Sequence, residues 1–289
     1  MIILNLKGGL GNQMFQYAFG RKLALKNNDE LKLDVEGLER ANKIGDIYRP
    51  FSLGRFNIEK TIATPKEVRG LKYPYGIFSK AWRWFNSKIL KQANVLWNPK
   101  ALNREGNLFI DGYWQSPKYF EDIRDVLLAD FTLAESLGNY GENVAFEIKN
   151  SNSVSIHIRR GDYIKNPQVL QEFGVCSDGY YQKAISLIKD KVNNPKFFIF
   201  SDDINWVKEN LEVGENAVFV NNPELTDTSE LFLMSQCKNN IIANSSFSWW
   251  AAWINQNPNK IVISPDPWFE NAKYDSTLIP DSWIKIPKN

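Results

Sequence analysis

One short stretch of the sequence, HIRRGDY at residues 157–163, concentrates side chains that bind anions. It follows an apolar run, VSIHI, that has the length of a buried strand. Arg159 and Arg160 carry planar guanidinium groups, which grip a phosphate or carboxylate through two hydrogen bonds. The alternative is a surface ion pair between one arginine and Asp162. His157, the single histidine of the chain, would either donate a hydrogen bond to the anion or anchor the turn.

Two further segments have the features of anion-binding loops. KGGLGNQ lies between an apolar run and a helical pattern, so Gly9 and Gly11 would let the backbone approach an anion at a helix N-terminus. Asn12 lies in the same loop. Ser245 and Ser246 begin another helical pattern and add hydroxyl and N–H groups at its positive end. A glycine turn before a helix is often only structural, but three such devices together indicate a diphosphate ligand.

The elements that must position these segments alternate between strand and helix in the second half of the chain. Five apolar runs of strand length, VSIHI, KFFIF, NAVFVN, NNIIAN and KIVIS, are separated by helical patterns at 178–192, 204–211, 227–237 and 245–256. This alternation predicts βαβ units and a parallel sheet. Polar clusters follow most of these runs, where parallel sheets bind their ligands. The sequence therefore predicts a ligand site along one rim of the sheet.

The first half of the chain is less regular. IILNL, LKLDV and NLFID resemble strands, and residues 12–28 have the spacing of a helix. A second helix is expected at 116–131, with Ser116 as N-cap and Pro117 at its first position. A weaker helical tendency covers about 79–92.

These patterns predict an α/β protein with two Rossmann-like domains facing a cleft. The polar stretch 134–152, with its two glycines, marks the boundary. We therefore expect an N-terminal domain at 1–150, which carries the GGLGNQ loop, and a C-terminal domain at 151–289.

Composition excludes several classes of protein. The chain has 35 Lys and Arg against 33 Asp and Glu, a net charge of +2, so no broad attraction to nucleic acid is expected. Two cysteines exclude a disulfide framework and a zinc ribbon. The sequence shows no signal peptide and no apolar stretch long enough to span a membrane. We expect a cytoplasmic protein, for which peripheral membrane association stays open.

Two other clusters each have two interpretations. The sequence SDD, at the end of KFFIF, is either a metal-binding carboxylate pair or a pair of caps, Asp202 and Asp203, for the helix at 204–211. We favour the caps and expect no metal site. The tryptophans between Trp249 and Trp253 have helical spacing, which favours a place in the core over a sugar-binding platform.

Four ordered motifs, KGGLGNQMFQYAFG, HIRRGDY, FSDD and LMSQCKNNIIANSSFSWWAAW, resemble the α-1,2-fucosyltransferases of glycosyltransferase family 11, in particular its bacterial members. The resemblance extends from residue 5 to about 268. It implies a GT-B-like fold and an inverting, metal-independent transfer of L-fucose from GDP-β-L-fucose to a sugar hydroxyl. It implies no cofactor besides the donor substrate, and it makes the C-terminal domain the one that binds GDP-fucose.

The resemblance also suggests roles for single residues. Arg159 and Arg160 would contact the donor diphosphate and stabilise the departing GDP. Glu230 stands where α-1,6 relatives have a carboxylate that reads guanine. Family members often have aspartate there, and Asp227 competes for the role. The expected donor-binding residues are Gly9, Gly11, Asn12, His157, Arg159, Arg160, Glu230, Ser245 and Ser246.

The acceptor side is less defined. The resemblance implies an α-1,2 linkage to the 2-hydroxyl of a terminal galactose, in an oligosaccharide or a lipid-linked glycan. Asp162 and Asp111 are the two candidates for the general base; a carboxylate beside two arginines has a lowered pKa and is a weak base. Trp114 and Gln115, which follow Asp111 in the sequence DGYWQ, would contact the acceptor sugar by stacking and hydrogen bonding.

Two other functions remain open at this point. Gly9 and Gly11 after a strand, with Asp34 at the end of the next strand, imitate the fingerprint of a dinucleotide-dependent oxidoreductase. Met14 stands where the third glycine of that fingerprint belongs. A non-catalytic sugar-binding module is suggested by the ten tryptophans.

Overall fold

The structure is a computed structural model that describes residues 1–38, 49–73, 89–92, 97–270 and 276–289. The chain folds as two compact units, Met1–Ala134 (unit 1) and Glu135–Asn289 (unit 2). The division falls at the start of the predicted boundary stretch and not at residue 150. Helix α6 (Gly138–Lys149) therefore belongs to unit 2. No helix of the described residues is both long and apolar enough to cross a lipid bilayer.

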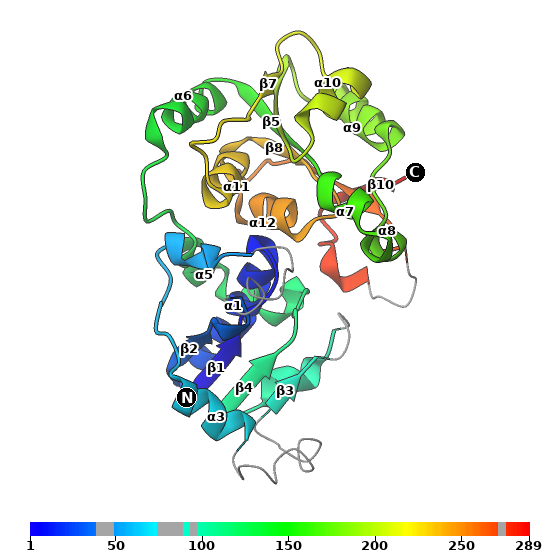
Figure 1. Cartoon of the computed structure of the whole chain (residues 1–289). Helices are drawn as coiled ribbons and strands as arrows, with labels where there is room; N and C mark the ends of the chain where they lie inside the picture. The colour runs from blue at the N-terminus through cyan, green and yellow to red at the C-terminus, as the bar shows by residue number, and fades with distance from the viewer. Residues whose placement is uncertain (39–48, 74–88, 93–96, 271–275) are drawn as a thin grey trace. The chain divides into compact units, whose positions relative to one another are not determined.

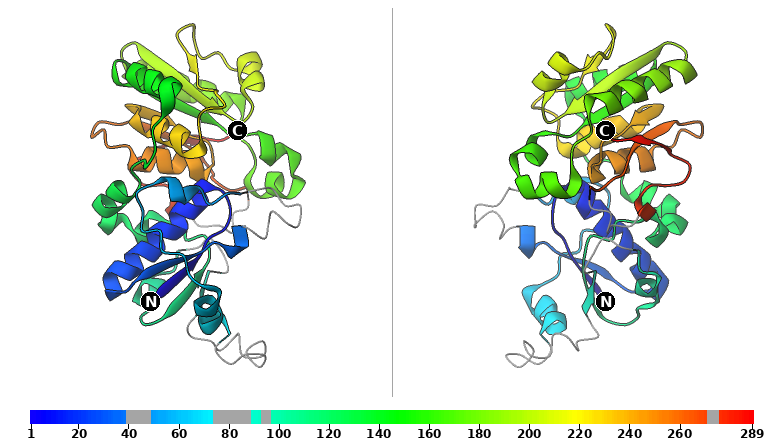
Figure 2. Two further views of the ribbon diagram at one scale, coloured as in Figure 1. Left: turned by 60° about the vertical axis from the view of Figure 1, so that its left-hand side comes forward. Right: turned by 90° about the vertical axis from the view of Figure 1, so that its right-hand side faces the viewer.

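Unit 1 is built on a four-stranded parallel sheet with the order β2-β1-β4-β3. Helix α1 (Leu10–Asn27) lies along one face of the sheet, and α3 (Pro65–Lys72) packs on the other face against Ile3 and Phe109 (Figures 1 and 2). Because Ile3 and Leu4 are both fully buried, β1 contributes apolar side chains to both faces. The strands are β1 (Ile2–Asn5), β2 (Leu31–Asp34), β3 (Ile89–Lys91) and β4 (Leu108–Asp111).

Two predictions for unit 1 were wrong. The helix expected at 116–131 breaks into 3-10 turns at Pro117–Tyr119 and Glu121–Ile123, followed by α5 (Arg124–Asp130). Tyr119 and Phe120 are buried against Phe19 and Phe15 of α1, so tertiary packing overrides the helical spacing. The helical tendency at 79–92 fails where it can be judged, because 89–91 form β3; residues 79–88 lie outside the described part of the chain. Further 3-10 turns lie at Ser52–Arg55 and Pro99–Asn103.

Unit 2 contains a six-stranded parallel sheet with the order β7-β6-β5-β8-β9-β10. Counted along the chain within the unit, this order is 3-2-1-4-5-6, that of the dinucleotide-binding Rossmann fold. The predicted strands are all present, although only two residues of NAVFVN pair. The last strand had not been predicted. The strands are β5 (Asn152–Ile158), β6 (Pro195–Ser201), β7 (Val218–Phe219), β8 (Asn239–Ile241), β9 (Val262–Asp266) and β10 (Ile284–Pro287).

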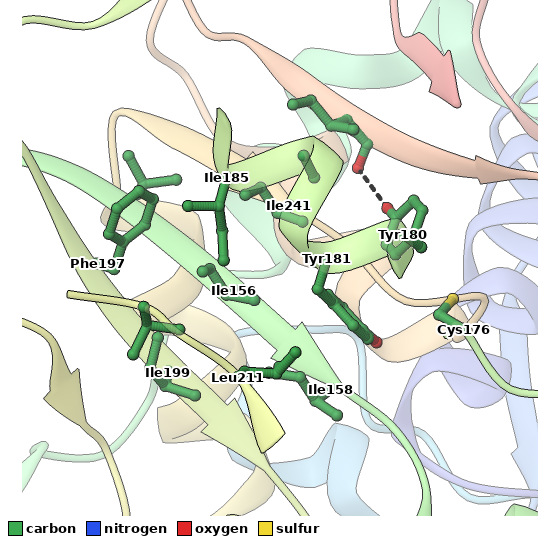
Figure 3. Packing of buried hydrophobic residues seen from close by; sticks show 14 of the residues in the cluster. Ile156, Ile158, Cys176, Tyr180, Tyr181, Ile185, Phe197, Ile199, Leu211 and Ile241 are labelled. Atoms are coloured by element: carbon green, nitrogen blue, oxygen red, sulfur yellow. Dashed lines mark hydrogen bonds between the residues drawn. The ribbon is translucent and has the colours of Figure 1, made fainter. Parts of the chain in front are cut away.

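The two faces of β5 bury different kinds of side chain. Ile156 and Ile158 belong to an apolar cluster with Tyr181 and Ile185 of α9 and Ile199 of β6 (Figure 3). On the alternate residues, Ser155 and His157 are polar but also buried. The helices of the unit are α7 (Gly161–Lys165), α8 (Pro167–Phe173), α9 (Asp178–Lys191), α10 (Ile204–Asn210), α11 (Asp227–Gln236) and α12 (Ser246–Ile254), and η7 (Ser276–Leu278) is a 3-10 turn.

Candidate active site

In both units the predicted motifs follow the two strands where the strand order changes direction. In unit 2, HIRRGDY follows β5 and the serine pair follows the neighbouring strand β8. In unit 1, the glycine loop follows β1 and DGYWQ follows the neighbouring strand β4. The crevice outside the carboxyl ends of such strands is the usual ligand site of open parallel sheets. Each unit therefore carries a candidate site.

Residues 159–161, which follow β5, form a turn that we call the arginine turn. It is held in place by Asp202, at the end of β6. Its carboxylate accepts hydrogen bonds from the backbone N–H of Arg160 (2.9 Å) and of Gly161 (3.1 Å), and forms an ion pair with Arg159 (3.3 Å). The cap prediction is thus confirmed for Asp203, whose side chain accepts from Trp206 N at the start of α10 (3.2 Å), and wrong for Asp202. Asp202 fixes the turn from the neighbouring strand.

The two arginines have different surroundings. The guanidinium of Arg160 lies over the indole ring of Trp206, 3.7 Å from its centroid, which fixes the plane of the fork. Arg159 is the partner of Asp202 and lies 5.9 Å from the ring centroid of Tyr163. Asp162 lies in α7, and its side chain is outside the described part of the structure, so its proposed role as base stays a prediction.

The serine pair begins α12, as predicted. Ser245 is the N-cap, and its hydroxyl accepts a hydrogen bond from Phe247 N (3.4 Å). Ser246 is the first helical residue and is half-buried. The imidazole of His157 is buried, with its centroid 5.5 Å from that of Phe247, so β5 and the first turn of α12 are in contact. Burial and the charge of Arg159 lower the pKa of His157 to about 3, which keeps the ring neutral.

Asn244, which sequence reasoning missed, connects the serine pair to the arginine segment. Its side-chain amide donates to the carbonyl oxygens of Phe173 (2.7 Å), the last residue of α8, and Gly174 (3.2 Å). The backbone carbonyl oxygen of Asn244 accepts a hydrogen bond from the hydroxyl of Tyr163 in α7 (3.3 Å). Asn244 is 1% exposed, so its polar groups depend on these partners for their hydrogen bonds. The sequence offered one indication of this role: Asn244 directly precedes Ser245 and Ser246, two residues predicted to bind the ligand.

Glu230 is a half-buried carboxylate on α11, and it has no hydrogen bond or ion pair with the described residues. Burial and the charges of Asp227 and Asp202 raise its pKa to about 7, against the opposing effect of Arg159. Asp227 accepts a hydrogen bond from Thr228 N (2.9 Å) at the start of the same helix. Glu230 is thus near enough to the arginine turn to sense its charges, and its carboxylate is available to a ligand.

The glycine loop of unit 1 is held from inside α1. Gln16 accepts from Lys7 N (3.0 Å) and donates to Lys7 O (3.1 Å), while Gln13 donates to Gly8 O (2.9 Å); both glutamines are fully buried. Gly8 has φ of +78°, a conformation that favours glycine. A Cβ on Gly9 would meet no atom within 4 Å, so the space beside this N-cap residue is open, as an approaching ligand requires. Gly11 is buried in the first turn of α1.

The end of β4 is brought together with the same loop. Lys7 Nζ forms an ion pair with Asp111 (2.9 Å), and Asn5 donates to the same carboxylate oxygen (3.1 Å). Burial raises the pKa of Asp111, but the hydrogen bond and charge of Lys7 outweigh it, so the pKa lies below its usual value. The amide of Gln115 donates to the side chain of Asn12 (2.7 Å), so two residues predicted for different substrates are neighbours.

Trp114 has a different environment from the one we expected. Its side chain is 1% exposed and stacks on Phe19 of α1, with ring centroids 4.0 Å apart. Trp114 adopts φ of +55°, and Gly112 leaves room for the indole, because a Cβ there would lie 2.9 Å from its Nε1. Sugar stacking by Trp114 is therefore incompatible with this conformation of the loop, since the ring is part of the core. Met14, at the position of the missing Rossmann glycine, is also buried.

No group of three or more His, Cys, Asp or Glu side chains that could hold a metal ion occurs among the described residues. The tryptophans of α12 lie in the core, as predicted, with Trp249 and Trp250 fully buried. Sequence reasoning missed several residues that shape the two sites: Asn5, Lys7, Gln13, Gln16, Tyr163, Trp206 and Asn244.

Comparison with known proteins shows similarity to glycosyltransferases over the whole length of the chain. The family model described as glycosyl transferase family 11 matches residues 1–286. The chain is 35% identical over 306 residues to an α-1,2-colitosyltransferase of Escherichia coli, covering 100% of this chain and 99% of the relative. It is 27% identical over 300 residues to the galactoside α-(1,2)-fucosyltransferase 2 of Rattus norvegicus, covering 99% and 77%.

Among solved structures, the chain resembles the NodZ α-1,6-fucosyltransferase that was soaked with GDP-fucose. The TM-score is 0.53 at 13% sequence identity, and the match covers 88% of this chain and 91% of that one. At this identity the likeness concerns the fold, and it confirms the predicted α/β, GT-B-like class. The family model spans almost the whole chain, and the first relative is matched over its full length. The chain belongs to glycosyl transferase family 11, and the resemblance seen in its four motifs is confirmed.

Proposed function

We propose that this glycosyltransferase transfers L-fucose from GDP-β-L-fucose to the 2-hydroxyl of a terminal galactose, with inversion, forming an α-1,2 linkage. The observation that carries the proposal is the arginine turn of unit 2. Arg159, Arg160 and the N-terminus of α12 gather where the Rossmann strand order changes direction. Both relatives described above have names that specify α-1,2 transfer of a sugar.

The donor would bind to unit 2 through its guanine base and through its diphosphate. Guanine presents N1–H and an amino group side by side, and the Glu230 carboxylate accepts from such a pair once it is ionised. The diphosphate would lie by the arginine turn and the first turn of α12, where N–H groups and the helix dipole favour an anion. The charge of Arg159 already acts on Glu230, which is consistent with one ligand spanning both.

Catalysis would depend on stabilising the departing GDP. Breaking the bond between fucose and phosphate develops negative charge on the phosphate and positive charge on the sugar ring. Because Asp202 and Trp206 fix the arginine turn before the donor arrives, little reorganisation would be needed as that charge develops. The arginines would supply this stabilisation in place of a divalent metal.

The acceptor hydroxyl would attack from the opposite face of the sugar, assisted by a general base. Asp111 and Asp162 stay the two candidates. Asp111 lies at the carboxyl edge of unit 1, but its ion pair with Lys7 makes it a weak base in this state. A base role for Asp111 therefore requires that Lys7 move away or that the acceptor displace it.

The deciding experiment is a transfer assay with GDP-fucose and a panel of galactosides, followed by linkage analysis of the product by NMR. We expect an α-1,2-fucosylated galactoside, and full activity after treatment with EDTA. Loss of activity in EDTA that Mn²⁺ or Mg²⁺ restores would contradict the metal-free mechanism. A product with another linkage, or no product with any galactoside, would contradict the proposed acceptor.

GDP-colitose is the competing donor, because the relative with 35% identity is named as a colitosyltransferase. Colitose is L-fucose without its 3-hydroxyl, so the two donors share the GDP group that unit 2 would recognise. Assays with each donor at equal concentration would compare their kcat/KM. We expect GDP-fucose to be preferred; a preference for GDP-colitose would change the sugar that is transferred and leave the GDP site as proposed.

A further inference from the structure

We propose that Tyr113, with Lys7 and Asp111, forms the subsite for the acceptor sugar, and that its ligand is an uncharged pyranose. The inference rests on the proposed function, because it concerns the sugar that receives fucose. It replaces the sequence-based assignment of stacking to Trp114 by an assignment to the preceding residue.

The segment DGYWQ presents Tyr113 and buries Trp114. The side chain of Tyr113 is 37% exposed, whereas that of Trp114 is 1% exposed and stacks on Phe19. Trp114, in a left-handed conformation (φ of +55°), lies between exposed Tyr113 and half-buried Gln115. A bulky residue rarely adopts this conformation, and such outliers cluster at ligand sites. The loop is therefore shaped so that tyrosine, and not tryptophan, offers its ring at the carboxyl edge.

The polar groups around the Tyr113 ring are fixed in place. Lys7 Nζ lies 4.9 Å from the ring centroid and 2.9 Å from a carboxylate oxygen of Asp111. Asn5 donates to the same oxygen (3.1 Å), so one oxygen of Asp111 carries both contacts. A single exposed aromatic residue needs no explanation, but an aromatic ring with a cation over one face, itself paired with a carboxylate, at a strand-order switch point resembles a binding site. The sugar would pack on the opposite face of the ring or displace the ammonium.

The side chains of Tyr113, Lys7 and Asp111 together can bind a sugar: the ring packs on its C–H surface, and the two charged groups form hydrogen bonds with its hydroxyl groups. A pyranose has a C–H surface that packs on an aromatic ring, and hydroxyl groups that both donate and accept hydrogen bonds. Asp111 and Lys7 supply one acceptor and one donor group. The charges of Lys7 and Asp111 compensate each other, so this ion pair carries no net charge and by itself favours a neutral sugar over a phosphate. Lys91 is a further cation that acts on Asp111.

The test compares Tyr113→Leu with Tyr113→Phe, using GDP-fucose and the galactoside that reacts fastest in the acceptor panel. Tyr113→Leu removes the ring and should raise the acceptor KM about tenfold, from the loss of aromatic packing. Tyr113→Phe keeps the ring and should stay within about twofold of the wild type. The KM for GDP-fucose and the thermal unfolding midpoint should be unchanged in both variants.

The matched control is Phe146→Leu, which makes the same kind of change at an aromatic residue that is 70% exposed on α6 of unit 2. An acceptor KM for Tyr113→Leu within about twofold of the wild type would overturn the inference. An equal rise in Phe146→Leu, or a rise in the KM for GDP-fucose instead, would overturn it as well.

Failure of the proposed function can be separated from failure of this inference. If the wild-type protein transfers nothing to any galactoside, the transfer proposal fails, and binding of methyl β-D-galactopyranoside is then measured directly by saturation-transfer NMR. Binding to the wild type that is lost in Tyr113→Leu and kept in Tyr113→Phe and Phe146→Leu supports the subsite. Equal binding by all four proteins, or binding by none, overturns it.

Discussion

The carboxyl edges of the two sheets differ in the charged side chains that they carry. In unit 2, Asp202 forms an ion pair with Arg159 and accepts a hydrogen bond from the backbone N–H of Arg160, and the N-terminus of α12 adds further positive character. In unit 1, Lys7 is paired with Asp111, Lys91 also acts on that carboxylate, and the described groups nearby include amides and an exposed tyrosine ring. Both edges lie at a change in strand order, although the sheets have four and six strands, and the chemistry of the residues that follow the strands differs. The fold supplies the location, and the side chains after each strand determine whether an anion or a neutral ligand is favoured.

The largest effect on activity is expected from substitutions in the arginine turn, which test whether the edge of unit 2 binds an anion. Arg159→Lys and Arg160→Lys keep the charge but lose the planar fork. We expect at least one variant to unfold at a near-normal temperature and to lose about 100-fold or more in kcat, since a transition-state donor is removed. His157→Ala should reduce kcat by a smaller factor than the more damaging of the two arginine substitutions. Steady-state kinetics and thermal unfolding measure both effects.

Near-normal turnover in both lysine variants would show that the turn has an electrostatic or structural role only. The matching exchange in unit 1 is Lys7→Arg, which keeps the charge beside Asp111. If it lowered kcat as much as the worse arginine variant, the proposed difference between the two edges would be wrong.

Glu230→Gln tests whether unit 2 reads guanine by charge. The variant should bind GDP about 10–100-fold more weakly, the range expected for a hydrogen bond to a charged group. Binding of UDP should hardly change, because UDP has the same diphosphate and no guanine. Isothermal titration calorimetry with both nucleotides measures the difference; unchanged GDP affinity would transfer the role to Asp227 or to the backbone.

Asp202→Asn tests whether the turn must be held from β6. The variant loses the ion pair with Arg159 and one of two acceptor oxygens, so we expect kcat to fall about tenfold. Asp203→Asn is the control, because asparagine caps a helix as well as aspartate does. It should stay close to the wild type. Equal losses in the two variants would indicate general damage to the end of β6.

The pH dependence of GDP binding should show the smallest effect. With its pKa raised to about 7, Glu230 is mainly protonated at pH 6 and mainly ionised at pH 8, and only the ionised form accepts both guanine donors. GDP affinity relative to UDP affinity should therefore rise several-fold across this range, and the rise should be absent in Glu230→Gln. A flat ratio in the wild type would exclude ionised Glu230 as the reader.

The same pKa has a consequence for stability with a definite sign. Protonated Glu230 favours the folded state, so its contribution is present below about pH 4.5 and is lost as the pH rises through about 7. Glu230→Gln should therefore raise the unfolding temperature relative to the wild type at pH 8, and the difference should shrink on acidification. A lower unfolding temperature at pH 8 would contradict the raised pKa.

The sequence predicted where the sites lie better than which side chains point into them. Apolar runs followed by polar clusters identified the carboxyl ends of β1, β4, β5 and β8, because strand length and alternation are local properties. The strand order that brings these ends together in pairs is not local. Likewise, neighbouring residues with the same chemistry were not told apart: Asp202 and Asp203 point to different elements, and only Asp203 caps α10.

Trp114 illustrates the other kind of failure. Tryptophan next to tyrosine in a loop predicts stacking on a ligand for either residue. The choice depends on the positive φ of Trp114 and on the space left by Gly112, which together turn the indole toward Phe19. Asn244 was missed because its partners are backbone carbonyls at Phe173 and Gly174, about which the sequence says nothing.

The position of β5 at the centre of the unit 2 sheet has a consequence for synthesis of the chain. Its partner β8 comes much later: the buried hydrogen bond between Ser155 and Asn240 joins residues 85 positions apart in the sequence. Proteins emerge from the ribosome from the N-terminus onward, so the arginine turn leaves it long before the helix start that would complete the proposed anion site. A nascent chain that ends before β8 has half of the proposed nucleotide site, so we expect GDP to stabilise the fold only after α12 has emerged and docked.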